Sequence, residues 1–167
     1  MSETCIIQEL IPHVDKTCRT IAAREGRAIH GWSMGGSGAL KFAFKYPELF
    51  GSAVAYGPGM TGSDTMKTKY SAVLQKMFGG DPERYEQEAF WTWIRKNADR
   101  ARGQVAVRVV VGAKDVSLGD SRGIRALLDD LNFPHDYEEV PDVPHRPLQL
   151  YPLAGLRSFR FSARQFK

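Results

Sequence analysis

The chain has 167 residues, 43% of them apolar and 25% charged, which is typical of one soluble globular domain with its own hydrophobic core. The net charge of +4 is small and no dense block of lysine and arginine occurs, which argues against nucleic acid as a partner. No stretch approaches the ~20 apolar residues of a membrane span, and the first residues lack the layout of a signal peptide. We therefore expect no membrane partner and a cytoplasmic location for the chain as written, with a secreted origin of a longer parent protein left open.

An amphipathic helix is predicted over residues 4–25, because apolar residues recur on one helical face. Proline lacks the backbone N–H of a helix donor, so we expect a step at Pro12, and Gly26 ends the helix. Cys5 and Cys18 lie in this helix, about 20 Å apart at 1.5 Å per residue, which is too far for a disulfide. The sequence therefore predicts two free thiols.

Two short strands are predicted in the next part of the chain. The segment "RAIHGWS" (27–33) indicates a strand that ends in the pattern Gly31-x-Ser33-x-Gly35. A helix follows over 36–46, and "GSAVAYGPG" (51–59) is small and apolar, as in a buried parallel strand.

The second half of the chain continues this alternation. Residues 62–100 read as a helical, cap-like excursion, and the valine-rich "QVAVRVVVGAKD" (104–115) indicates the clearest strand. A helix capped by Asp120, a short strand over 135–140 and a final helix from residue 148 complete the order. Such alternation predicts a single α/β domain over 1–167, with about four parallel strands flanked by helices.

The pattern around Ser33 has two interpretations. It is either a strand-to-helix crossing that needs small residues for steric reasons, or a nucleophile elbow that holds a reactive serine. In the second case the turn is strained, and bulky residues at Gly31 or Gly35 would clash. The backbone N–H of Met34 would then stabilise an oxyanion. The strand before the pattern and the helix after it favour the elbow.

A serine nucleophile requires a base and an acid that orients the base, and the elbow predicts them in the chain order acid, then histidine. Asp115 directly follows the strongest strand and is the favoured acid. Asp120 is an alternative that is also explained as a helix cap. Asp142 is a second alternative, close to the histidine loop.

Four histidines compete for the role of base. His145, in "VPHRP", follows the last strand on a loop stiffened by two prolines and is the favoured candidate. His13 falls on the first helix, His30 on the strand before Ser33, and His135 at a helix-to-strand turn.

Aromatic residues are weaker candidates for a substrate pocket. Trp32 lies inside the serine pattern and is a candidate substrate contact, whereas Phe90, Trp91 and Trp93 are spaced as core residues. No metal-ligand spacing, phosphate loop or dinucleotide fingerprint occurs, so we expect neither metal nor cofactor.

The chain resembles the putative-esterase family of α/β-hydrolases, which includes esterase D-like, feruloyl, acetyl-xylan and enterochelin esterases and the mycolyltransferases. The resemblance is carried by "ELIPHVDKTCRTIAAREGRAIHGWSMGGSGAL", "MFGGDPERYE", "VRVVVGAKD" and "EEVPDVPH". It implies serine-dependent cleavage of small, short-chain or aryl carboxylic esters through an acyl-enzyme. The family's nucleophile falls on Ser33, its acid on Asp115 and its base on His145. Alternatives are an acyltransferase of the same fold and an inactive hydrolase remnant that serves as an interaction module.

The resemblance also implies an abbreviated, minimal α/β-hydrolase core. The family's earlier strands, and the loop that supplies its second oxyanion donor, have no counterpart in this sequence. The strand before Ser33 would then lie at a sheet edge, where an apolar surface invites association. We therefore expect a homo-oligomer, most simply a dimer, that covers this edge.

Overall fold

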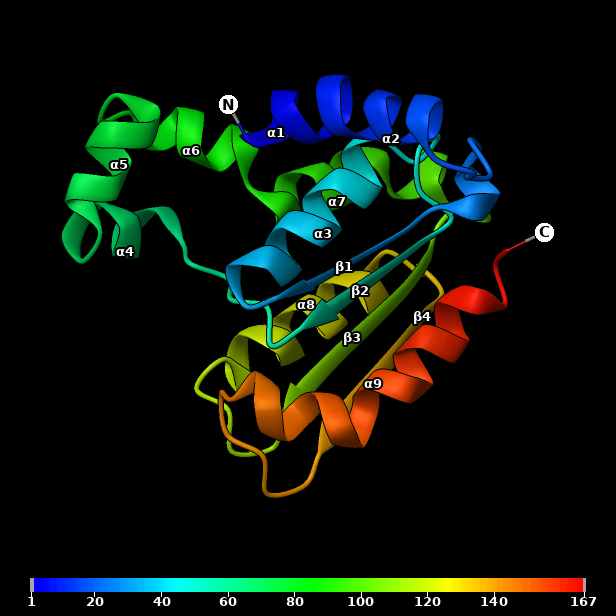
Figure 1. Cartoon of the computed structure of the whole chain (residues 1–167). Helices are drawn as coiled ribbons and strands as arrows, with labels where there is room; N and C mark the ends of the chain where they lie inside the picture. Colours follow the sequence, from blue (N-terminus) through cyan, green and yellow to red (C-terminus); the bar gives the residue numbers. More distant parts are fainter. Residues whose placement is uncertain (1, 167) are drawn as a thin grey trace.

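The computed structural model describes residues 2–166 and shows a layered arrangement of helices around one sheet (Figure 1). In chain order the elements are α1 (Ser2–Thr4), the π-helix η1 (Cys5–Leu10), α2 (Ile11–Thr17), the 3-10 turn η2 (Arg24–Gly26), β1 (Ala28–Trp32), α3 (Met34–Lys45), β2 (Ser52–Tyr56), α4 (Ser63–Thr68), α5 (Ser71–Phe78), α6 (Pro82–Glu88), α7 (Phe90–Ala101), β3 (Ala106–Gly112), α8 (Leu118–Asp130), β4 (His135–Val140) and α9 (Pro147–Ala163).

The sheet has four parallel strands in the order β1-β2-β3-β4, which confirms the predicted α/β class. Helices α3, α7 and α8 cover one face, and α9 covers the other (Figure 1). Because all four strands run the same way, their carboxyl ends meet at a single edge of the sheet. Loops that follow different strands are thereby brought together there.

The larger core lies between the sheet and helices α3, α7 and α8. Its fully buried side chains include Leu40, Phe44, Ile94, Ile124 and Leu128. Burial of each such side chain stabilises the folded state by about 1.5–3 kcal/mol. Small residues on β2 let α3 approach closely, as the buried alanines of "SAVAY" indicate.

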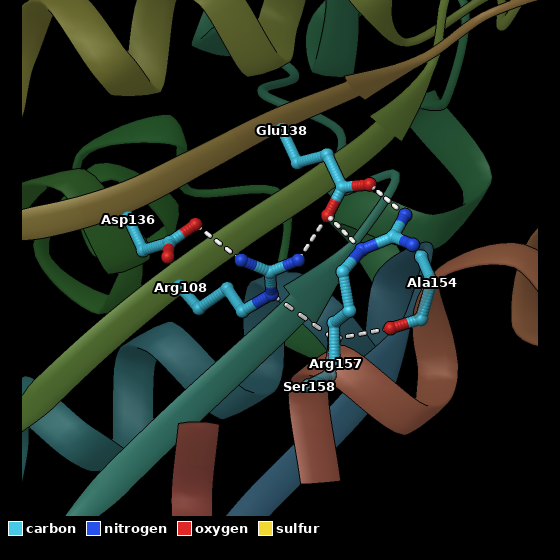
Figure 2. Close-up of polar contacts among 6 residues, drawn as sticks. All are labelled: Arg108, Asp136, Glu138, Ala154, Arg157 and Ser158. Carbon is cyan, nitrogen blue, oxygen red and sulfur yellow. Dashed lines mark hydrogen bonds and ion pairs between the residues drawn. The ribbon is translucent and has the colours of Figure 1, made fainter. Parts of the chain in front are cut away.

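The smaller core, under α9, contains a buried arginine. Arg108 of β3 pairs with Asp136 and Glu138 of β4, and its Nε donates to Ser158 Oγ of α9 at 3.1 Å (Figure 2). Glu138 also pairs with Arg157 of α9. A buried guanidinium is tolerated only when its charge and donors are matched, and these partners supply that match. The network therefore joins β3, β4 and α9.

The first predicted helix is shorter than expected. It ends at Thr17, since Cys18 is extended with φ −117° and ψ 159°, and it does not continue to residue 25. Its middle is π-helical, with the Ile11 N–H bonded to the Ile6 carbonyl just before Pro12, which has no N–H to offer. Both cysteines are exposed free thiols.

The expected cap of α8 is also wrong. Ser117, and not Asp120, precedes the helix, which begins at Leu118. The Asp115 carboxylate binds the Ser117 N–H at 2.7 Å and the Leu118 N–H donates to the Asp115 carbonyl at 3.1 Å, so the turn closes earlier than the sequence indicates. Asp120 instead accepts a hydrogen bond from the Met60 N–H at 3.0 Å.

The predicted excursion over residues 62–100 consists of helices α4 to α7 joined by short turns. Its last helix, α7, packs against α3 and belongs to the main core. That the chain forms one domain with a cap-like excursion stays a prediction. Within residues 2–166, no helix combines the length and apolarity that crossing a bilayer would require.

Candidate active site

Ser33 lies at the junction of β1 and α3 in an unusual backbone conformation. Its φ is 54° and its ψ is −118°, a region that residues with a side chain rarely adopt. The Ser33 N–H donates to the Tyr56 carbonyl of β2 at 2.8 Å, which holds the strained turn at the sheet edge. Strain of this kind persists only where the surrounding structure enforces it.

The two glycines that flank Ser33 are not equivalent. A Cβ on Gly31 would lie 2.0 Å from the Gly35 carbonyl oxygen, so any side chain there would clash with the first turn of α3. A Cβ on Gly35 would have no atom within 4 Å. The expected steric requirement therefore holds for Gly31 and is wrong for Gly35, because Gly35 points away from the crossing.

Ser33, His145 and Asp115 form a continuous hydrogen-bonded series. The Nε2 atom of His145 lies 3.0 Å from Ser33 Oγ, and Nδ1 lies 2.9 Å from each carboxylate oxygen of Asp115. The three residues follow β1, β4 and β3 respectively. The parallel strands thus bring together, at one edge, side chains that are 112 and 30 positions apart in sequence.

The Asp115 carboxylate is enclosed by partners that the sequence did not single out. Its side chain is 0% exposed, and both the N–H and the Oγ–H of Ser117 donate to Oδ1 at 2.7 Å. The lack of a side chain at Gly57 (φ 51°) leaves space for both groups, since a Cβ there would lie 3.1 Å from Asp115 Oδ2 and 3.3 Å from His145 Nδ1. A buried carboxylate needs such donors. The Asp-x-Ser spacing of an Asx turn is the signal that predicts Ser117.

Aromatic rings line the side of His145 that faces α9. The Trp32 ring packs against the imidazole with ring centroids 4.7 Å apart and planes inclined at 37°. Tyr151 of α9 lies next to Trp32, at 6.0 Å between centroids. Burial raises the pKa of the Tyr151 phenol, so this ring stays neutral at physiological pH. The side chain of His145 is 29% exposed and so is reachable from solvent.

Met34 begins α3 directly after Ser33, and the residue is 86% exposed. The first N–H groups of a helix have no acceptor within the helix, and they favour negative charge. That the Met34 N–H stabilises an oxyanion stays a prediction.

The other candidate acids and bases contact different groups. Asp142 is exposed and pairs with Lys114 at 2.7 Å. His30 Nε2 lies 2.8 Å from Ser162 Oγ under α9, and burial lowers the pKa of His30, which favours its neutral form. His135 Nδ1 lies 2.8 Å from the Phe133 carbonyl, and His13 lies on α2. None of these four residues contacts Ser33 in the described structure.

The aromatic residues of α7 belong to the core. Phe90 and Trp91 are buried there, and Trp93 packs against the same cluster. Within residues 2–166, no group of three or more histidine, cysteine, aspartate or glutamate side chains is arranged to hold a metal ion.

The comparisons with known proteins place this architecture in a family. The model of the Esterase family, described as "Putative esterase", matches residues 2–138. The chain belongs to this family. Esterase Rv1288 of Mycobacterium tuberculosis is 46% identical over 162 residues, an alignment that covers 83% of this chain and 35% of that protein.

Solved structures share the fold. An S-formylglutathione hydrolase from Agrobacterium tumefaciens aligns with a TM-score of 0.79 at 19% identity, over 99% of this chain and 57% of that one. A ferulic acid esterase aligns with a TM-score of 0.72 at 23% identity, over 99% and 61%. The chain thus spans about a third of its curated mycobacterial relative and about three fifths of these hydrolases.

Proposed function

We propose that this chain is a serine carboxylic-ester hydrolase in which Ser33 is the nucleophile, His145 the base and Asp115 the acid that orients it. The observation that carries the proposal is the unbroken series of hydrogen bonds from Ser33 through His145 to the buried Asp115. Membership of the Esterase family supports ester hydrolysis independently of this geometry.

The polarity of the hydrogen bonds assigns the first proton transfer. Asp115 is an acceptor, so His145 carries its proton on Nδ1 and presents the Nε2 lone pair to the Ser33 hydroxyl. As Ser33 Oγ attacks the ester carbonyl carbon, its proton passes to Nε2, and the carbonyl oxygen becomes an oxyanion. The backbone N–H of Met34 donates to that oxyanion. Collapse of the tetrahedral intermediate expels the alcohol, which takes the proton from Nε2 and leaves an acyl-serine.

Deacylation repeats these steps with water. His145 accepts a proton from the water molecule as its oxygen attacks the acyl carbon, and the proton then returns to Ser33 Oγ as the carboxylic acid leaves. Asp115 stays ionised and stabilises the imidazolium in both halves of the reaction.

We assign small, short-chain or aryl esters as the substrate class. The names of the similar proteins, an esterase, an S-formylglutathione hydrolase and a ferulic acid esterase, support esters and thioesters of small acyl groups. Trp32, next to the serine, is the proposed substrate contact, because its ring borders His145.

Hydrolysis of p-nitrophenyl acetate and butyrate by the wild type and by Ser33→Ala tests the proposal. We expect the substitution to reduce kcat/KM by about 10³-fold or more. Ser71→Ala, at the exposed start of α5, is the matched control and leaves the rate unchanged. Equal rates for wild type and Ser33→Ala would refute the assignment and favour an inactive remnant. Faster product formation with added alcohol would indicate acyl transfer.

We also propose that the chain forms a homodimer through the outer edge of β1. β1 is the end strand of the sheet and all five of its residues are partly exposed. Beside it, α9 carries exposed apolar side chains, among them Leu148, Tyr151, Leu156 and Phe159. The same surface on a second copy would pair with this edge and cover these side chains.

A further inference from the structure

The imidazole of His145 has three neighbours that contact different parts of the ring. Asp115 bonds Nδ1 at 2.9 Å, and Ser33 bonds Nε2 at 3.0 Å. Trp32 packs against the ring itself, with centroids 4.7 Å apart. The two polar partners fix the ring at its nitrogen atoms, and the indole limits rotation of the ring plane about the axis that joins them.

Trp32 is in turn held by the fold. It is the last residue of β1, and its ring lies 6.0 Å from that of Tyr151 of α9. Tyr151 packs edge-on against Tyr56 of β2 at 4.9 Å, with the ring planes at 78°. The indole that meets His145 is thus positioned by β1, β2 and α9, whereas His145 itself lies on the loop between β4 and α9.

On the basis of the proposed function, we propose that Trp32 is a positioning residue for His145. Its π-face holds the imidazole in line with Ser33 and stabilises the imidazolium that forms when His145 takes the Ser33 proton. A cation within about 6 Å of a tryptophan ring is attracted by the negative face of that ring. The 4.7 Å separation lies inside this range. The indole therefore favours the charged form of His145 over the neutral form.

Few other charges are placed to have this effect. The ionisable groups on the elements around His145 include Asp115, the exposed Arg146, the exposed ion pair of Lys114 with Asp142, Asp120, Tyr56, Tyr151 and His30. Arg108 of β3 and Arg157 of α9 pair with Glu138 of β4, and Arg160 of α9 is exposed. Of these described groups, Asp115 is the one that bonds the imidazole. A substitution of Trp32 leaves all of them in place, so its effect on the titration of His145 reports the indole.

Trp32→Leu and Trp32→Phe test this role through the pH profile of p-nitrophenyl acetate hydrolysis. Leucine keeps apolar bulk without a π-face, whereas phenylalanine keeps an aromatic face. For Trp32→Leu we expect kcat to fall about tenfold with KM nearly unchanged, and the acid limb of kcat/KM to move to lower pH, because the imidazolium loses a stabilising partner. Trp32→Phe restores part of both effects.

Phe159→Leu is the matched control, because Phe159 packs at 5.3 Å on the other histidine of β1, His30. It leaves the acid limb unmoved. A raised KM with an unmoved acid limb in Trp32→Leu would overturn the proposal and assign Trp32 to substrate contact alone.

A readout that does not need turnover separates this proposal from the proposed function. NMR titration of the His145 Cε1–H, assigned with His145→Gln, gives the midpoint of imidazole protonation in each variant. We expect a lower midpoint in Trp32→Leu than in the wild type, even if no ester is hydrolysed. Identical midpoints would refute the role of Trp32, whereas shifted midpoints in a protein whose wild type hydrolyses no ester would refute only the esterase assignment.

Discussion

Ser33 shows how a single residue depends on the space around it. Its positive φ is tolerated because β1 and α3 cross within contact distance, and Gly31 is the residue that permits this crossing. Ser117 has an equivalent role at Asp115, where it supplies two donors to one buried oxygen. Both effects act on single atoms, so both are testable by the smallest substitutions.

We predict that Gly31→Ala destabilises the protein by about 1–3 kcal/mol, the usual effect of overpacking. The added methyl would otherwise lie 2.0 Å from the Gly35 carbonyl oxygen. Gly35→Ala is the matched control, since its methyl meets nothing within 4 Å and alanine favours the helix. Urea unfolding followed by circular dichroism measures both. Equal stability of the two variants would contradict the steric explanation.

Ser117→Ala should lower kcat by about tenfold, because hydrogen bonds to charged groups are worth about 1.5–3 kcal/mol and part of that holds Asp115 in place. The backbone N–H of residue 117 remains as a donor, which limits the loss. Ser117→Thr keeps the hydroxyl and should retain most of the activity. An unchanged kcat in Ser117→Ala would show that Asp115 needs no side-chain donor.

At the scale of elements, polar contacts fix how helices sit on the sheet. Arg108 joins β3, β4 and α9 (Figure 2). Glu3 joins the N-terminal helix to α3. These polar contacts add to the stabilisation that the two apolar cores provide. They differ in burial, and so in how much each one stabilises the fold.

We predict that Arg108→Leu costs about 2 kcal/mol of unfolding free energy. Breaking a buried ion pair usually costs about 3–5 kcal/mol, but Glu138 keeps Arg157 and Asp136 is half exposed, so the stranded carboxylates are partly compensated. Arg100→Leu, which breaks the exposed pair with Glu48, should cost less than about 1 kcal/mol. Urea unfolding of the two variants compares them directly, and equal losses would contradict the network's role.

The contribution of Glu3 to the free energy of unfolding depends on pH. Burial alone would raise the pKa of Glu3, but hydrogen bonds from Lys45, Tyr46 and Lys41 lower it to about 2. The folded pKa lies below the unfolded value of 4.5, so this stabilisation is complete above that value and is lost as the pH falls toward 2. Glu3→Gln should therefore be less stable than wild type at pH 7 and equal to it near pH 2.

Thermal unfolding across this range measures the effect. The exposed Glu9→Gln is the control and should follow the wild-type curve. A constant difference between Glu3→Gln and wild type at all pH values would contradict the ionic origin of the contact.

The sequence predicts most elements because their signals are local. Valine-rich β3 and the alternation of strands and helices required no tertiary information. The start of α8 at Leu118 follows from a local turn at Asp115, whereas the end of the first helix at Thr17 and the open space beside Gly35 are seen only in the structure. The same is true of the site. Ser33, Asp115 and His145 are readable from motif and order, whereas the roles of Gly57 and of the Trp32 ring appear only once the strands are placed side by side.

For the whole molecule, the open side of the sheet is the main consequence of the strand order. β1, which leads into Ser33, forms the end of the sheet, and exposed apolar residues of α9 lie beside it. The chain covers about three fifths of the hydrolases it resembles in structure. The proposed dimer is one way to cover this surface.

We predict a dimer in sedimentation equilibrium at micromolar concentration, dissociated by Leu156→Glu. Leu156 is 62% exposed on α9, and a charge there cannot be buried between two copies without a partner. Val73→Glu, on the exposed side of α5, is the control and leaves the dimer intact. A monomeric wild-type protein would refute the proposed interface.

The position of Ser33 directly after the end strand also bears on the order of folding. The serine lies 112 positions from His145, and the two meet only when all four strands are in place. Contacts so distant along the chain form late, because closing the loop between them precedes any gain in stability. Any partly folded species, even one rich in helix, would therefore lack the assembled site, and recovered activity would report the last step of folding.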